Sequence, residues 1–128
     1  MLIRILWYYI ADMRNTIKKH QNFLIGENDL NARCAMFFVR ARPAHFTEDP
    51  QYGLVVTKKL FKFAVDRNRA KRLLRDWIRF NEKYMCDNLD YIFIARRGIL
   101  QTNRTDGREA MRKALHYIKK LNAEITNA

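Results

Sequence analysis

One stretch of the sequence constrains the fold more than any other: KKLFKFAVDRNRAKRLLRDWIRF, from Lys58 to Phe80. It holds nine lysine and arginine residues against two acidic ones, together with enough apolar side chains to require burial. At about 100° per residue, the apolar and the basic side chains fall on opposite sides of a helix. The apolar side, which we expect to pack on a sheet, comprises Ala70, Leu73, Leu74, Trp77 and Ile78.

The other side of the predicted helix is cationic. Its basic row is formed at four-residue steps and widened by two neighbours: Arg67, Lys71, Arg75 and Arg79, with Asn68 and Arg72. Like charges at this spacing destabilise an isolated helix by a few tenths of a kcal/mol. The formal net charge of the chain is +12, and this stretch supplies more than half of it, which indicates a polyanionic partner. Composition alone does not distinguish a nucleic-acid-binding helix from an ordinary amphipathic helix with a solvated basic face.

The residues that precede this row favour phosphate binding. Lys58 and Lys59 lie where a predicted strand ends, and we place Arg67, Asn68 and Arg69 in the first helical turn. Free backbone N–H groups and the positive end of the helix dipole attract anions there, and arginine is unfavourable there without one. We therefore predict that an anion occupies this end of the helix.

The rest of the chain predicts the order helix, strands, helix, strand, helix. The first helix is expected from Asn15 to Gly26, and the last from Thr105 to Leu121. Strands are expected at Arg33 to Ala41, Gln51 to Lys58 and Asp90 to Arg97. Because a polar, turn-forming segment separates the first two strands, we expect them to pair as an antiparallel hairpin.

The length of 128 residues fits one domain. We assign residues 15–122 to a single α/β domain, residues 1–14 to an N-terminal extension of unknown role, and residues 123–128 to a C-terminal tail. The apolar start is interrupted by Arg4 and is too short for a spanning helix, and it lacks the small-residue cleavage site of a signal peptide. Two interpretations remain: an N-terminal extension that packs on the domain or frays, or a segment that lies on a membrane surface. We expect a cytoplasmic protein with no membrane partner.

Neither a metal site nor a catalytic residue is predicted. Cys34 and Cys86 stand in unrelated contexts and are interpreted as reduced, and the three histidines are scattered. A self-sufficient nuclease needs converging carboxylates, whereas the acidic pair Glu48 and Asp49 falls in a predicted turn.

The segment RNRAKRLLR, Arg67 to Arg75, resembles the signature R-N-x-x-K-R-x-x-R of the protein-subunit family of bacterial ribonuclease P. Every fixed position of that signature is matched, by Arg67, Asn68, Lys71, Arg72 and Arg75. GLVVTKK at residues 53–59 and DYIFIARRG at residues 90–98 resemble two strands of the family, and IKKHQNF resembles its first helix. The resemblance spans about Thr16 to Leu121.

The resemblance implies an α/β sandwich of order α-β-β-β-α-β-α, with a left-handed crossover through the basic helix. It also implies an accessory subunit of an endoribonuclease that removes the 5′ leader of precursor tRNA. In that family the protein binds the catalytic RNA and the leader, and the RNA performs the hydrolysis with Mg²⁺ that it largely holds itself. The alternative is a general RNA-binding or ribosome-associated module.

The family resemblance also implies two sets of site residues. Those facing the catalytic RNA are Arg67, Asn68, Lys71, Arg72 and Arg75, and the positions of Arg69 and Arg79 on the basic helix add these two arginines to the set. Those facing the leader are Phe23, Phe38, Thr57, Lys58 and Lys59. Arg96, at the end of the last predicted strand, is either a further backbone contact or plain surface charge. Phe23 and Phe38 either stack on bases or pack in the core. The chain departs from the family pattern at Phe61 and Ala70, so the loop before the basic helix is expected to differ in shape. It also departs at Glu27, where relatives often have a second aromatic residue, so the resemblance supports only the Phe23 half of that aromatic platform.

Overall fold

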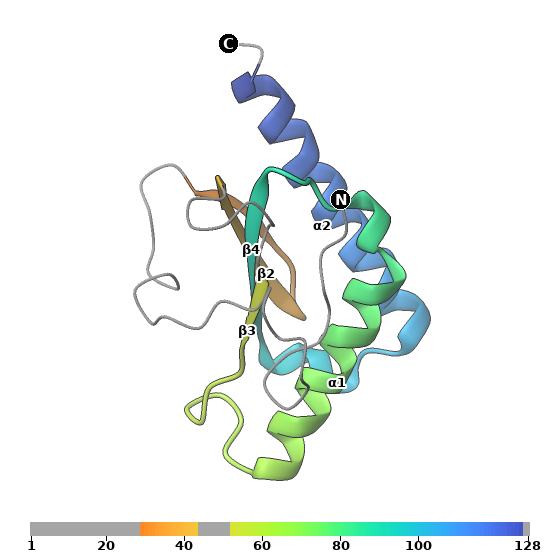
Figure 1. Ribbon diagram of the computed structural model, residues 1–128. Coiled ribbons are helices and arrows are strands. Elements are labelled where there is room, and N and C mark those ends of the chain that lie inside the picture. Colours follow the sequence, from red (N-terminus) through yellow and green to blue (C-terminus); the bar gives the residue numbers. More distant parts are fainter. Residues whose placement is uncertain (1–28, 44–51, 127–128) are drawn as a thin grey trace, which may run out of the picture.

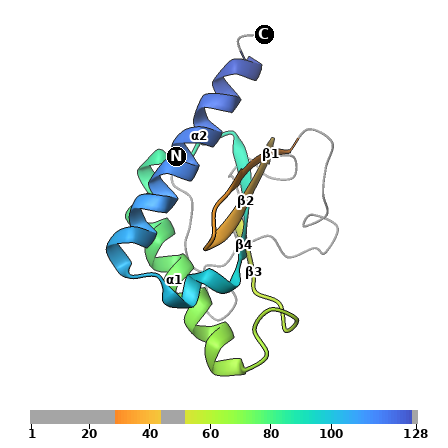
Figure 2. The same cartoon turned by 180° about the vertical axis from the view of Figure 1, so that it is seen from behind.

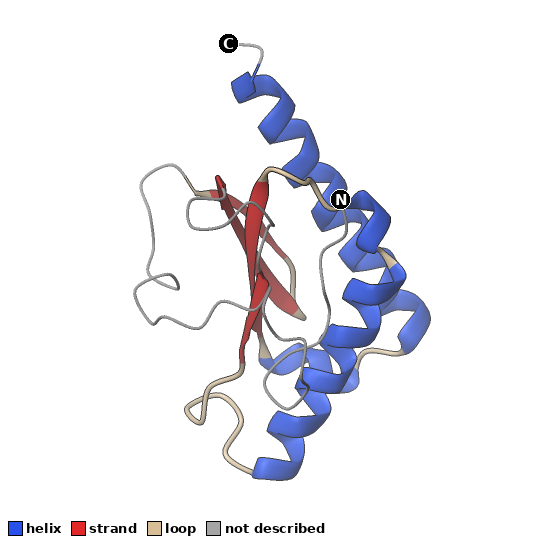
Figure 3. Cartoon of the chain, in the orientation of Figure 1, coloured by secondary structure: helices blue, strands red, loops and turns tan. Residues whose placement is uncertain are grey.

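The computed structural model describes residues 29–43 and 52–126. Within them, four strands form one sheet and two long helices lie on one side of it (Figure 1). Figure 3 shows the same view with helices in blue and strands in red. The strands are β1 (Leu30–Arg33), β2 (Phe37–Pro43), β3 (Tyr52–Val55) and β4 (Leu89–Ala95). The helices are α1 (Ala64–Phe80) and α2 (Arg104–Thr126), with single-turn 3-10 helices η3 (Glu82–Tyr84) and η4 (Arg97–Gln101). The predicted first helix, at residues 15–26, lies outside the described residues.

The strand order is β1-β2-β4-β3, and it corrects one prediction. The strands β2 and β3 do not form a hairpin, because β4 lies between them, antiparallel to β2 and parallel to β3. Six of the seven residues of β4 are buried, and a strand that is buried on both faces belongs in the middle of a sheet. The helix α1 makes the crossover that a parallel pair requires. The left hand implied for this crossover stays a prediction.

The segment predicted as one strand from Arg33 to Ala41 is instead the end of β1, a tight turn and most of β2. The turn carries neither Gly nor Pro, so it gives no local signal in the sequence. A distant residue makes room for it: a Cβ atom on Gly98 would lie 2.6 Å from the carbonyl oxygen of Ala35. The turn is therefore specified by a tertiary contact between η4 and the β1–β2 connection.

Figure 2 shows the sheet and the two helices from behind. The hydrophobic core lies between these two layers. The predicted apolar side of α1 is confirmed, since Ala70, Leu74, Trp77 and Ile78 are buried and Leu73 is partly buried. From α2 the buried hydrophobic side chains are those of Met111, Leu115 and Ile118. The departures from the family pattern at Phe61 and Ala70 also lie in this core, with 2% and 0% of their surfaces exposed.

Polar groups fix the packing of α1 against α2. Arg108 donates to both carboxylate oxygens of Asp76, at 3.2 Å from Nε and 3.0 Å from Nη2. The buried amide of Asn81 donates to the carbonyl oxygens of Trp77 and Arg108, both at 2.9 Å. These contacts leave α1 with one face toward α2 and the sheet and another available to a partner. The helix α2 continues through Thr126, and the division into extension, domain and tail stays a prediction.

Candidate nucleic-acid interface

The residues predicted to face the catalytic RNA all lie on α1, and we call them the α1 basic face: Arg67, Asn68, Arg69, Lys71, Arg72, Arg75 and Arg79. Asn68, Arg69, Arg72 and Arg79 are exposed, and the other three are half-buried. The acid best placed to offset them, Asp76, is engaged by Arg108 of α2. Positive charge therefore dominates this face, as the sequence predicted.

One part of the helix-start prediction is wrong. The helix α1 begins at Ala64, so Asn68 and Arg69 lie beyond its first turn. Alanine is the strongest helix former, and nothing in the preceding residues delays the start until Arg67. The free N–H groups at the start of α1 therefore lie beside Ala64 rather than beside the exposed arginines.

Arg67 holds the loop that leads into α1. Its Nη1 donates to the carbonyl oxygens of Phe61 and Lys62, at 2.8 and 3.0 Å. From the other side, Nη1 of Arg97 donates to the carbonyl oxygen of Leu60 at 3.3 Å. Two guanidinium groups thus fix three successive loop carbonyls. No local pattern in the sequence predicts this role, because both bonds depend on how the loop folds back on α1 and η4.

Thr57 shapes the turn on which the two predicted leader-binding lysines are carried. Its hydroxyl oxygen accepts from the N–H of Leu60 at 3.3 Å, and its carbonyl oxygen accepts from the N–H of Phe61 at 2.9 Å. Lys58 and Lys59 lie on this turn and are exposed. Both ammonium groups are thus carried on ordered backbone.

Phe38 lies on the sheet face away from α1 and α2, whereas its neighbours Phe37 and Val39 are buried beneath the helices. Cross-strand partners share a face of a sheet, so one row runs across all four strands. We call it the outer sheet row: Arg33, Phe38, Ile94 and Val55. With neighbouring strands about 4.8 Å apart, the row is roughly 14 Å wide. Phe38 therefore lies outside the core between the sheet and the helices and is half-buried.

Two guanidinium groups flank the ring of Phe38. The Cζ atoms of Arg33 and Arg40 lie 4.7 and 5.5 Å from the ring centroid. Arg40 is buried, and its Nε lies 3.6 Å from Oδ2 of Asp29. Burial lowers the pKa of Arg40, and the negative charge of Asp29 acts in the opposite direction. Arg33 is the exposed cation of this row. It is not among the predicted site residues, because the sequence predicts one continuous strand from Arg33 to Ala41, whereas Arg33 and Phe38 pair across two strands.

The described leader-binding candidates gather at one edge of the sheet. The strands β3 and β4 are parallel, so the chain leaves both at the same edge. Thr57, Lys58 and Lys59 follow β3, while Arg96 follows β4 and donates from Nη1 to the carbonyl oxygen of Cys34 at 3.1 Å. Phe23 and Glu27 lie outside the described residues.

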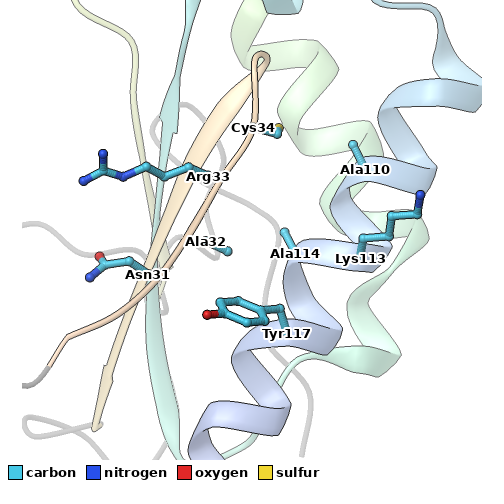
Figure 4. A pocket seen from close by; sticks show the side chains of 8 residues that line it. All are labelled: Asn31, Ala32, Arg33, Cys34, Ala110, Lys113, Ala114 and Tyr117. Carbon is cyan, nitrogen blue, oxygen red and sulfur yellow. The ribbon is translucent and has the colours of Figure 1, made fainter.

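A separate groove of about 520 Å³ lies between β1 and α2 (Figure 4). The small side chains of Ala32, Ala110 and Ala114 line it, and Tyr117 reaches from α2 toward β1. The side chains of Asn31 and Arg33 extend away from α2, and the Lys113 amine points away from β1. The interior of the groove is therefore apolar and less suited to phosphates than the α1 basic face. Cys34 borders it, and both cysteines are free thiols, as predicted.

Over residues 29–43 and 52–126, no group of three or more His, Cys, Asp or Glu side chains gathers where it would hold a metal ion. The acidic pair Glu48 and Asp49 lies outside these ranges. None of the helices described there combines the length and apolar character needed to cross a bilayer.

The fold and these surfaces define the class: a mixed α/β protein with a cationic helix face and an aromatic, cationic sheet face. The chain belongs to the ribonuclease P protein family, whose model matches residues 11–119. The ribonuclease P protein component of Desulforapulum autotrophicum is 30% identical over 100 residues, covering 78% of this chain and 85% of the relative.

Other relatives match over shorter stretches or by fold. The component of Baumannia cicadellinicola is 36% identical over 72 residues, which are 56% of this chain and 62% of that protein. The chain thus spans less than two thirds of the length of this curated relative. A mutant of the RNase P protein of Staphylococcus aureus superposes with a TM-score of 0.70 at 24% identity, covering 83% of this chain and 89% of that one, which shows the shared fold.

Proposed function

We propose that this chain is the protein subunit of ribonuclease P and that it docks on the catalytic RNA through the α1 basic face. The observation that carries the proposal is the separation of the two sides of α1. The family signature, Arg67 to Arg75, lies on the side away from the sheet, while Ala70 and Leu74 between its members are buried and Leu73 is partly buried. Exposed guanidinium and ammonium groups neutralise phosphates and release counterions, which gives salt-dependent affinity.

The proposed second partner is the 5′ leader of precursor tRNA. An unpaired strand is bound by aromatic rings that stack on bases and by cations that follow its backbone. The outer sheet row supplies Phe38 with Arg33, and the sheet edge supplies Lys58, Lys59 and Arg96. Because phosphates carry no sequence information, these cations bind leaders of different sequence alike.

In this proposal the RNA subunit performs the phosphodiester hydrolysis and largely holds the Mg²⁺ that the reaction uses. The protein contributes binding and orientation, with no acid, base or nucleophile of its own. The family membership and the resemblance of the signature residues support this division of labour.

A competition experiment tests the proposal. Binding of the full chain to labelled ribonuclease P RNA is measured against unlabelled ribonuclease P RNA and against ribosomal RNA of similar length, at fixed ionic strength. The proposal expects the first competitor to displace the labelled RNA at a concentration at least about tenfold lower than the second, since specific contacts add to the charge-driven affinity. Equal competition indicates a general RNA-binding module instead.

A further inference from the structure

Phe63 is exposed in a place where an aromatic side chain is unexpected. It is the N-cap residue of α1, makes no side-chain cap hydrogen bond, and leaves 62% of its surface exposed. Small polar residues are preferred at this position because they bond the free backbone N–H groups. Phe61, two residues earlier, is buried in the core. The loop thus anchors one ring and presents the other to solvent.

A pocket of about 280 Å³ opens beside the Phe63 ring, between the loop, the start of α1 and η4. Its volume is near the lower end of the range of roughly 300 to 1,000 Å³ for small-molecule sites, which suits one planar heterocycle. The lining combines an aromatic ring, two cations, a carboxylate and an amide: Phe63, Lys62, Arg97, Asp66 and Gln101.

The pocket is built on ordered backbone. The carbonyl oxygens of Leu60, Phe61 and Lys62 accept hydrogen bonds from Arg67 and Arg97, as described above. When the backbone of a site is fixed before binding, the affinity is not reduced by the entropy cost of ordering a loop. The carbonyl oxygen of Phe63 itself accepts from the N–H groups of Asp66 and Arg67, each at 3.1 Å, so the backbone that carries the exposed ring is fixed as well.

We infer that this pocket binds one unpaired nucleobase of the RNA that docks on the α1 basic face, with the base stacked on Phe63. The inference rests on the proposed function for the identity of the RNA. The carboxylate of Asp66 disfavours a free phosphate in the pocket, yet it accepts hydrogen bonds from the amino group of a base. Lys62 and Arg97 are placed to contact the flanking phosphates.

The test measures equilibrium binding of the full chain to ribonuclease P RNA and to single-stranded pentamers of adenylate, cytidylate and uridylate. Phe63→Leu keeps an apolar side chain without a ring, and we expect it to weaken binding by about 5- to 150-fold, the equivalent of one lost base stack. The dependence of affinity on salt stays unchanged, because no charge is removed. Phe63→Trp retains affinity within about twofold, because it keeps a stacking ring.

Two further variants complete the design. Val65→Ala alters an apolar side chain that is 69% exposed and does not line the pocket, so it leaves affinity unchanged. Asp66→Asn narrows the preference for adenylate and cytidylate over uridylate, because uracil has no amino group for the carboxylate to accept from. Equal thermal midpoints for Phe63→Leu and the wild type show that the fold is intact.

If Phe63→Leu binds both probes within twofold of the wild type, the pocket inference is overturned while the proposed function stands. If the wild type does not prefer ribonuclease P RNA to ribosomal RNA, the proposed function fails. In that case, selective loss of pentamer binding by Phe63→Leu still supports the pocket, and its absence overturns it.

Discussion

The guanidinium of Arg67 donates a hydrogen bond to the carbonyl oxygen of Phe61, with Nη1 2.8 Å from the oxygen. Phe61 is buried and Arg67 begins the family signature, so this bond ties α1 to the core through the loop between β3 and α1. A signature residue thus has a structural role beside the RNA contact that we propose for it. A loss of RNA binding in an Arg67 variant therefore does not by itself show an RNA contact, because the variant also loses the hydrogen bonds that hold the loop.

Arg67→Ala is expected to lower the free energy of unfolding by about 1 to 3 kcal/mol, because two carbonyl oxygens lose a charged donor. Urea denaturation followed by circular dichroism measures the change. Arg69→Ala, on the same helix but exposed, is the matched control and is expected to stay within about 0.5 kcal/mol of the wild type. Equal midpoints for the wild type and Arg67→Ala contradict the structural role.

The pair Arg69→Ala/Arg72→Ala isolates RNA binding, because both side chains are exposed and neither holds the loop. If each contacts one phosphate, the slope of log affinity against log salt becomes shallower by about 1.4 to 1.8. The matched control, Lys119→Ala/Lys120→Ala, removes two exposed cations from α2 and leaves the slope unchanged. Equal effects of the two pairs indicate that net charge rather than the α1 basic face drives binding.

Phe38→Leu is expected to weaken binding of precursor tRNA by the reconstituted holoenzyme by about 1 to 3 kcal/mol, the worth of one base stack. Binding of mature tRNA, which lacks the leader, stays unchanged. Tyr117→Leu, an exposed aromatic residue of the β1–α2 groove, is the control and leaves both affinities unchanged. Equal losses for the two tRNAs place Phe38 outside the leader contact.

Gly107→Ala is expected to lower the free energy of unfolding by about 1 to 3 kcal/mol. A Cβ atom at residue 107 would lie 2.0 Å from Cε2 of the buried Trp77 ring, so α2 must shift away from α1. The thermal midpoint measures this effect. Glu109→Ala, which alters an exposed residue of the same helix, is the control. An unchanged midpoint for Gly107→Ala contradicts the packing described between α1 and α2.

The sequence predicts α1 well because both of its faces follow from a local period of 3.6 residues. Ala70 and Trp77 are buried and Arg72 is exposed, as that period requires. The pairing of strands follows less readily, because it depends on contacts between distant residues. The close approach of Gly98 to Ala35 defines the β1–β2 turn from more than sixty residues away, and no local signal marks it.

The candidate site also combines residues that the sequence predicts with residues that only the structure assigns. The signature identified the α1 basic face, but two adjacent phenylalanines in β2 leave open which of them points outward. The structure assigns Phe37 to the core and Phe38 to the outer sheet row. Phe63 is not among the predicted site residues. A signal for it is present in the sequence, because the lysine-rich loop holds two phenylalanines, and only Phe61 is buried.

The most direct test of the central claim is 5′ cleavage of precursor tRNA by a bacterial ribonuclease P RNA at low Mg²⁺. The reaction is run without protein, with the wild-type chain, with Arg69→Ala/Arg72→Ala, and with the Lys119→Ala/Lys120→Ala control. We predict that the wild type and the control restore cleavage and that the Arg69→Ala/Arg72→Ala chain requires a higher concentration to do so. If the wild-type chain gives no gain over RNA alone while it remains folded, the assignment as a ribonuclease P subunit is contradicted.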